Sequence, residues 1–174
     1  FVHRDLACRN VLVVGASGAD VEVRLGDWGN AAAFDDATGL PSGARAAPDA
    51  DATLPLRWSP PEAVSSLGDR TFALGAQWGP KADVWALGVL GWELWASPQV
   101  PYGLETADAA VARTLAAGGA PARPGGMPAD VYALLRHGCW QRAPAMRPSA
   151  ARLARLIAWL LDGGIERDPE RVAD

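Results

Sequence analysis

Cysteine is scarce in this sequence: only Cys8 and Cys139 occur, with no CxxC or Cys/His ligand spacing. This excludes a disulfide framework and a thiolate metal site, and it favours a reducing compartment. No apolar run approaches the roughly 20 residues that a membrane helix needs, so we expect no membrane contact from this segment. Runs of Lys and Arg never exceed two residues and the net charge is −4, which disfavours a nucleic-acid partner.

Apolar residues, in contrast, make up 49% of the 174 residues, which is enough for one globular core. Val11–Val14 and residues 21–25 have strand patterns around a Gly-containing turn, and they predict a small β-hairpin. Residues 30–52 are mainly Ala, Asp, Gly and Pro, which predicts a loop. Residues 81–95 carry apolar side chains on every face, which predicts a helix buried all round as the axis of the core.

Three further segments have the apolar stripe of an amphipathic helix, and Thr106 is a candidate N-cap for the first of them. The last begins at Pro148-Ser149 and ends at Gly163-Gly164. The stripes are Val111, Thr114 and Leu115 in residues 106–117; Val131, Leu134 and Leu135 in residues 129–138; and Leu153, Leu156, Ile157, Leu160 and Leu161 in the last helix.

The strongest chemical signal is the stretch His3-Arg4-Asp5-Leu6-Ala7-Cys8-Arg9-Asn10. It resembles the catalytic loop of protein kinases, in which the Asp and the Asn serve substrate and metal from one loop. That resemblance implies that Asp5 orients the attacking hydroxyl and accepts its proton, and that Asn10 supplies an oxygen ligand to Mg²⁺. It also implies catalytic-loop roles for Arg4 and Arg9 and a structural role for His3. The tripeptide His-Arg-Asp alone could be a chance surface turn, but the motifs that follow it come in the kinase order.

Gly26-Asp27-Trp28-Gly29 follows the predicted hairpin, at the position where kinases have Asp-Phe-Gly. The resemblance implies that Asp27 holds the Mg²⁺ that bridges the phosphates of ATP, because a hard cation prefers carboxylate oxygen. Trp28 replaces the usual Phe, and its larger ring is expected to change how this turn switches between active and inactive arrangements. Taken by itself, Asp-Trp-Gly fits an ordinary turn equally well.

Two motifs further along the chain are expected to have structural roles. The stretch Leu54 to Pro-Pro-Glu62 resembles the end of a tyrosine-kinase activation segment, and in that family the Glu pairs with an Arg in the position of Arg147. Breaking such a partly buried pair should be costly. Asp83, at the start of the predicted central helix, matches the residue that braces the catalytic-loop backbone in kinases. A helix N-terminal charge is the simpler interpretation of Asp83.

Together these motifs make the chain resemble the C-terminal lobe of protein kinases. The resemblance implies a mainly α fold with a small β-hairpin beside the catalytic loop, ATP and Mg²⁺ as cofactors, and a protein as substrate. The expected parts are a C-lobe at 1–162, a catalytic loop at 3–10, an activation segment at 27–62, a helical subdomain at 81–162 and a polar tail at 163–174.

The sub-family signals diverge. Ala7, Arg9 and the Pro-Leu-Arg-Trp block resemble tyrosine kinases, whereas the Leu-Arg-Trp spelling and the insert between Glu62 and Asp83 resemble the lemur tail (lemur tyrosine) kinases. That group is membrane-anchored with cytosolic kinase domains and is credited with Ser/Thr phosphorylation. The resemblance therefore implies a kinase on the cytoplasmic side of a single-pass membrane parent, with either Tyr or Ser/Thr as acceptor.

The sequence has no glycine-rich phosphate loop, strand Lys or helix Glu of the ATP-binding lobe, and it begins at Phe1 directly on a motif. We therefore expect that the N-terminal lobe is absent, that the chain is a segment of a longer one, and that it is inactive alone. A pseudokinase-like interaction module is the alternative function.

Both tyrosines, Tyr102 and Tyr132, lie outside 27–62, so a phosphotyrosine cannot order that segment through Arg4. Our hypothesis is that acids or phosphorylated hydroxyls replace it, with a solvated acidic loop as the simpler interpretation. The candidate residues are Asp35, Asp36, Asp49, Asp51, Thr38, Ser42 and Thr53.

Overall fold

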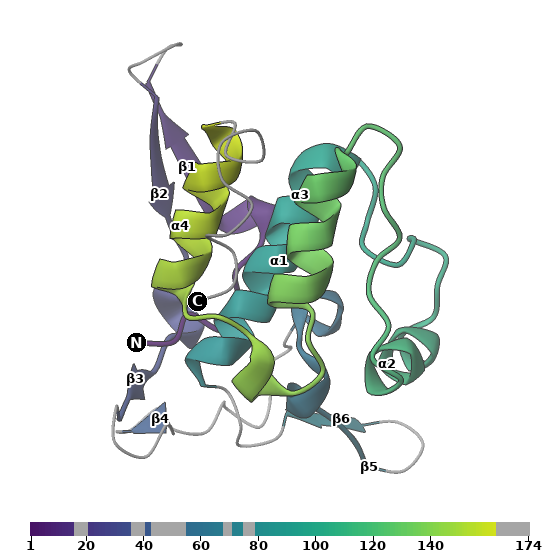
Figure 1. The fold of residues 1–174 in the computed structure, drawn as a ribbon. Helices are drawn as coiled ribbons and strands as arrows, with labels where there is room; N and C mark the ends of the chain where they lie inside the picture. The colour runs from purple at the N-terminus through teal and green to yellow at the C-terminus, as the bar shows by residue number, and fades with distance from the viewer. Residues whose placement is uncertain (16–20, 36–40, 43–54, 68–70, 75–78, 163–174) are drawn as a thin grey trace.

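The fold is mainly helical and is known from a computed structural model, which describes residues 1–15, 21–35, 41–42, 55–67, 71–74 and 79–162. Figure 1 shows α1 and α3 side by side at the centre, α4 beside the β1–β2 pair, and α2 at the periphery. The helices are α1 (Pro80–Ala96), α2 (Asp108–Ala116), α3 (Ala129–Leu134) and α4 (Ala150–Leu161). None of the helices described is both long and apolar enough to cross a membrane.

Helix α1 is the axis of the core, as its sequence predicts. Pro80 begins it, where a missing N–H costs nothing. Trp85 and Val89 of α1 are fully buried, and they pack in one cluster with Val111 of α2 and Leu153 of α4. The whole cluster contains Val84, Trp85, Val89, Trp92, Ala96, Val111, Leu115, Met127, Leu135, Cys139, Trp140 and Leu153.

The expectation that α1 is buried on every face is wrong at its last turn. Leu94 is 68% exposed and Trp95 is 46% exposed, although Trp92 and Ala96 beside them are buried. Apolar composition alone cannot distinguish a covered helix face from an uncovered one.

The N-termini of α2 and α4 differ from each other. Ser149 caps α4, because its Oγ accepts a hydrogen bond from the N–H of Arg152 at 3.2 Å. Thr106 does not cap α2 as expected: its hydroxyl donates to the carbonyl of Tyr102, and α2 begins only at Asp108. The competing local hydrogen bond explains the difference, since hydroxyl side chains often bond nearby backbone groups.

The apolar stripes are buried to different degrees. In α2, Val111 and Leu115 are buried as expected, but Thr114 is exposed and donates to the carbonyl of Ala110. The segment 129–138 forms α3 and a wider helical turn, Leu135–Cys139, that packs on α1. Of the five stripe residues of α4, only Leu153 is buried.

Within the described residues, the strands form three separate pairs. The predicted hairpin is β1 (Val11–Val14) and β2 (Glu22–Leu25), antiparallel, with Val11 opposite Leu25 and Val14 opposite Glu22. Residues 30–52 are not entirely a loop as expected, because β3 (Ala33–Phe34) pairs with β4 (Pro41–Ser42). A third pair joins β5 (Val64–Leu67) to β6 (Thr71–Leu74). A backbone hydrogen bond needs no particular side chain, so Ala and Pro were poor guides to β3 and β4.

Candidate functional site

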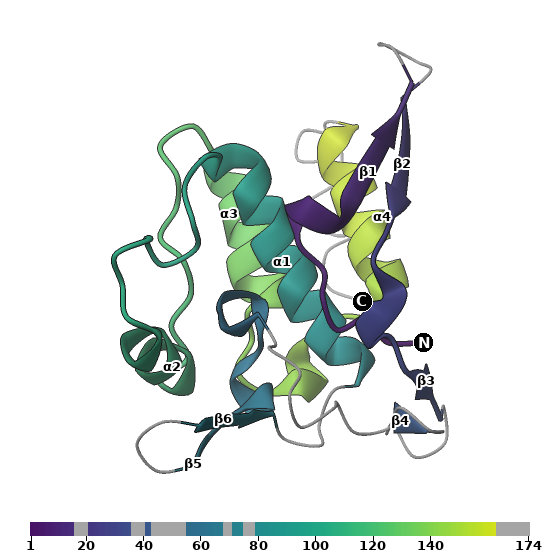
Figure 2. The same cartoon turned by 180° about the vertical axis from the view of Figure 1, so that it is seen from behind.

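The first residues of the chain are fastened along α1 at two places. Asp83, in the first turn of α1, accepts hydrogen bonds from the backbone N–H of His3 at 2.6 Å and of Arg4 at 3.0 Å. Near the other end of α1, Glu93 accepts from the N–H of Cys8 at 2.9 Å. Figure 2 shows this first segment, in purple, running along α1 before it enters β1. The loop 3–10 is therefore held by α1, which has more buried residues than any other described helix.

Burial sets the electrostatics of the first anchor. It raises the pKa of the Asp83 carboxyl above its ordinary value, and the N–H donors and charges of His3 and Arg4 only partly offset this. Burial also lowers the pKa of the Arg4 guanidinium, while the charge of Asp83 opposes that shift. Arg4 has a left-handed backbone with φ of 70°, an uncommon conformation for a residue with a side chain. The anchor thus holds the loop backbone in a shape that it would rarely adopt alone.

Asp5 and Asn10 lie together at the centre of this loop. The side-chain amide of Asn10 donates to the backbone carbonyl of Asp5 at 2.8 Å and to its Oδ2 at 2.9 Å. The other carboxylate oxygen of Asp5 accepts a hydrogen bond from the guanidinium of Arg9. Asp5 is buried, at 8% exposed, and its carboxylate is oriented through both of its oxygens. Such a fixed carboxylate can align a hydroxyl and accept its proton.

His3 connects the loop to the turn after β2. Its Nδ1 accepts a hydrogen bond from the N–H of Asp5 at 3.3 Å, so its Nε2 carries the proton and donates to the carbonyl of Gly26 at 3.0 Å. Its ring lies against Trp28, with centroids 4.6 Å apart. Gly26 also donates to the carbonyl of Asn10 at 2.8 Å. These contacts place the residue after Gly26 close to the loop 3–10.

That residue is Asp27, whose backbone is left-handed with φ of 56°. Among the described residues, its exposed carboxylate accepts one long hydrogen bond, from the N–H of Gly29 at 3.4 Å. Asn10 uses its amide nitrogen on Asp5, which leaves its side-chain oxygen for another partner. Asn10 and Asp27 thus offer oxygen donors of the kind that Mg²⁺ prefers. No group of three or more His, Cys, Asp or Glu gathers at a metal-binding distance in the described part of the chain.

Trp58 is a site residue that sequence reasoning missed. It ends a short helical turn, Leu56–Trp58, and the guanidinium carbon of Arg9 lies 4.6 Å from its ring centroid. The preceding residue, Arg57, donates to backbone carbonyls of the loop between α1 and α2. The Pro-Leu-Arg-Trp motif drew attention to this segment, but the motif does not indicate which residue the Trp58 ring faces.

Glu62 and Arg147 come together far from the loop. The guanidinium of Arg147 donates to both carboxylate oxygens of Glu62, at 2.5 and 2.7 Å. It also donates to the carbonyls of Lys81 and Gln141, each at 2.8 Å, and lies 5.0 Å from the ring centroid of Trp85. Arg147 is thus a buried junction between the segment that ends at Glu62 and the start of α1.

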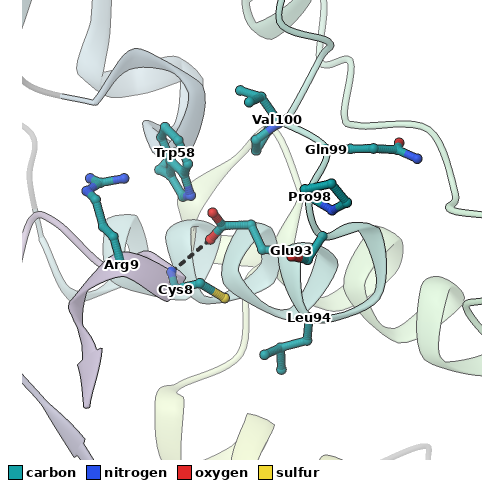
Figure 3. Close-up of a pocket in the computed structure, with 10 residues that line it drawn as sticks. Cys8, Arg9, Trp58, Glu93, Leu94, Pro98, Gln99 and Val100 are labelled. Atoms are coloured by element: carbon teal, nitrogen blue, oxygen red, sulfur yellow. Dashed lines mark hydrogen bonds between the residues drawn. The ribbon is translucent and has the colours of Figure 1, made fainter. Parts of the chain in front are cut away.

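A pocket of about 470 Å³ opens beside the loop 3–10. Figure 3 shows Arg9 and Trp58 on one side of it, Pro98 and Val100 on another, and Glu93 bonded to the backbone of Cys8. The Cys8 thiol is buried enough for desolvation, together with the charge of Glu93 and a hydrogen bond to it, to raise its pKa to about 11. The pocket is large enough for a side chain of a partner molecule.

Arg4, Asp5, Arg9 and Asn10 therefore belong to the loop 3–10 itself, and Asp27 follows the turn that contacts it. Asp83 and Trp28 contact the loop through His3. Glu62 and Arg147 pair elsewhere in the fold. Of the proposed switching residues, Asp35 is described, but Asp36, Thr38, Asp49, Asp51 and Thr53 lie outside the described residues, and so does the side chain of Ser42. The tail 163–174 is likewise outside them.

Known proteins resemble this chain over most of its length. A family profile described as "Protein tyrosine and serine/threonine kinase" matches residues 1–157. The rat high affinity nerve growth factor receptor is 34% identical over 149 residues, which cover 86% of this chain and 16% of that receptor. Human tyrosine-protein kinase ABL2 is 38% identical over 152 residues, which cover 87% of this chain and 11% of that protein. The mouse leukocyte tyrosine kinase receptor is 32% identical over 159 residues, which cover 91% and 16%.

Proposed function

Because this chain belongs to the protein tyrosine and serine/threonine kinase family and has the mainly helical fold of a kinase C-terminal lobe, we propose that it supplies the catalytic half of a protein kinase. The reaction is phosphoryl transfer from ATP to a hydroxyl of a protein substrate. The chain spans less than a fifth of the relatives named above, so the activity of the whole protein is part of this proposal.

The observation that carries the proposal is the doubly held carboxylate of Asp5. Asn10 and Arg9 each bond one of its oxygens, and the backbone just before Asp5 is fixed to Asp83. In this position Asp5 orients the acceptor hydroxyl and takes its proton as the new bond to phosphorus forms. Asn10 and Asp27 would hold Mg²⁺, which when bound neutralises charge on the phosphates of ATP.

Tyrosine is the acceptor that the relatives favour, since the names of those reported describe tyrosine kinases or growth factor receptors. Serine or threonine is the alternative specificity, which the resemblance to lemur tail kinases predicts. That sub-family assignment also predicts a parent protein with a single membrane span and its kinase on the cytoplasmic side. Matched peptides that carry Tyr, Ser or Thr at one position distinguish the acceptors, and fractionation of cells checks the location.

We further propose that these 174 residues do not transfer phosphate alone, because the sequence contains no glycine-rich loop or strand Lys to position the nucleotide. The test therefore uses the full-length gene product. Asp5→Asn should abolish phosphoryl transfer while nucleotide binding persists, because the amide cannot accept the proton. Unchanged transfer by this variant would contradict the assignment of Asp5.

The alternative, a pseudokinase-like interaction module, is favoured by one contact: the ring of Trp28 lies against His3, beside the proposed metal ligand Asp27. Titration of the full-length gene product with ATP and Mg²⁺ distinguishes the two functions. A kinase must bind both, and Asp27→Asn should weaken binding of the metal–nucleotide complex. A protein that binds neither, with unaltered folding, would support the interaction module instead.

A further inference from the structure

Three side chains form a continuous path from the end of the activation segment to the catalytic carboxylate. The ring of Trp58 faces the guanidinium of Arg9, with 4.6 Å between the ring centroid and the guanidinium carbon. Arg9 in turn forms an ion pair with one oxygen of Asp5. The second oxygen of Asp5 accepts from Asn10 at 2.9 Å. The rotation of the Asp5 carboxylate therefore depends on where Arg9 is held.

Arg9 is weakly held without its aromatic neighbour. Its side chain is 44% exposed, and a partly exposed ion pair by itself fixes a long side chain poorly. Stacking on an aromatic face restricts the guanidinium to one plane and adds a favourable electrostatic contact. The face of Trp58 is thus the feature that gives the Arg9 guanidinium a defined orientation in its ion pair with Asp5.

Trp58 is itself well anchored. Its backbone N–H donates a hydrogen bond to the carbonyl of Pro55 at 2.9 Å. The adjacent Arg57 donates to the carbonyls of Pro101 at 2.9 Å, Gly103 at 3.0 Å and Thr106 at 2.6 Å. The turn that carries Trp58 is thereby fastened to the loop between α1 and α2, so the ring has a fixed place relative to the core.

We propose that Trp58 is a positioning residue for phosphoryl transfer: it holds Arg9, and through Arg9 it sets the orientation of the Asp5 carboxylate. This inference rests on the proposed kinase function. In this arrangement the orientation of the Asp5 carboxylate depends on the position of the Leu56–Trp58 turn at the end of the activation segment. Displacement of that turn therefore lowers the rate of phosphoryl transfer without changing the binding of the nucleotide.

The kinetic test uses the full-length gene product. Trp58→Ala should lower kcat by about 2- to 30-fold, the range that corresponds to loss of one cation–π contact, with KM for ATP unchanged. Trp58→Phe should restore most of the rate, because the indole Nε1 has no hydrogen-bond partner among the described residues and Phe keeps an aromatic face. Trp95→Ala is the matched control, since Trp95 is exposed on α1 and should leave kcat unchanged.

A double-mutant cycle separates positioning from loss of packing. If Trp58 acts through Arg9, Trp58→Ala should have little further effect on kcat in an Arg9→Ala background, so the two changes will not add. Full additivity would overturn the inference. So would failure of Trp58→Phe to rescue while Trp58→Ala remains folded by circular dichroism.

A readout that needs no activity keeps this inference separate from the proposed function. In carboxyl-labelled protein, Trp58→Ala should shift the ¹³C signal of the Asp5 carboxyl, and Trp95→Ala should not. An unshifted Asp5 signal would overturn the positioning role even in an active kinase. If the wild-type protein transfers no phosphate but the Asp5 signal shifts, the proposed function fails and the coupling of Trp58 to Asp5 stands.

Discussion

Arg147 and Glu62, which are 85 positions apart in the sequence, form a bidentate ion pair with N–O distances of 2.5 and 2.7 Å. The guanidinium side chain is fully buried and the carboxylate side chain is only 11% exposed. Two backbone carbonyls, of Lys81 and Gln141, take up further N–H donors of Arg147. A paired charge of this kind is tolerated inside a protein only while its partner remains. The pair thus fastens Glu62, and the segment 55–62 that contains it, to the helical core.

Glu62→Ala should therefore destabilise the fold by about 3–5 kcal/mol, because it leaves the buried charge of Arg147 without its partner. Denaturant unfolding of the purified protein measures this change. Glu22→Ala is the matched control: Glu22 pairs with Arg24 on the surface, and both side chains are more than half exposed. The control should change stability by less than about 0.5 kcal/mol. Equal effects at the two positions would contradict the role of burial.

The pH dependence of stability should contain a contribution from Asp83. Burial raises the pKa of this carboxyl above 3.8, so the folded state binds its proton more tightly than the unfolded state. The resulting stability is present below about pH 3.8 and is lost as the pH rises through the higher folded value. Asp83→Asn, which stays neutral, should lack this loss. Between pH 4 and pH 7, the unfolding free energy of the wild type should fall relative to that of the variant as the pH rises. A difference that stays constant over this range would refute the prediction.

Cys8 should react slowly with alkylating reagents despite its place at a pocket. Its pKa is raised from 9.0 to about 11, so at pH 8 it has about a hundredfold less thiolate than an unshifted thiol. Time-resolved iodoacetamide labelling followed by peptide mass spectrometry measures the rate. Glu93→Gln should speed the reaction, because it removes a negative charge that disfavours the thiolate. Labelling of native Cys8 as fast as in denatured protein would show that the thiol is not perturbed.

Gly88→Ala should destabilise the core by about 1–3 kcal/mol through overpacking. A methyl group at Gly88 would lie 2.5 Å from Cβ of Cys139 and 2.8 Å from Nε1 of Trp140, closer than packed atoms approach. At Gly126 the same methyl would meet nothing within 4 Å, so Gly126→Ala is the matched control. Thermal unfolding of both variants compares them, and a Gly88→Ala protein as stable as the control would show that α1 can move away from Cys139.

The fold was predictable where the signal is local. Val11–Val14 with residues 21–25 predicted the hairpin, and the apolar run of 81–95 predicted α1, because strand and helix patterns are written in neighbouring residues. Burial was not predictable in the same way. Leu94 and Ile157 are as apolar as Leu153, yet only Leu153 lies inside the core. Whether a side chain is covered depends on other segments, not on its own helix.

The chemical groups and their order can be read from the sequence alone: the Asp5 carboxylate, the Asn10 amide and the Asp27 carboxylate, in the pattern of a kinase. The residues that hold these groups in place are known only from the folded chain. Asp83 reaches His3 across 80 positions, and Trp58 comes to lie on Arg9 from a different part of the chain. Contacts between residues so far apart follow from how α1 and the surrounding segments pack, and packing is a property of the whole fold.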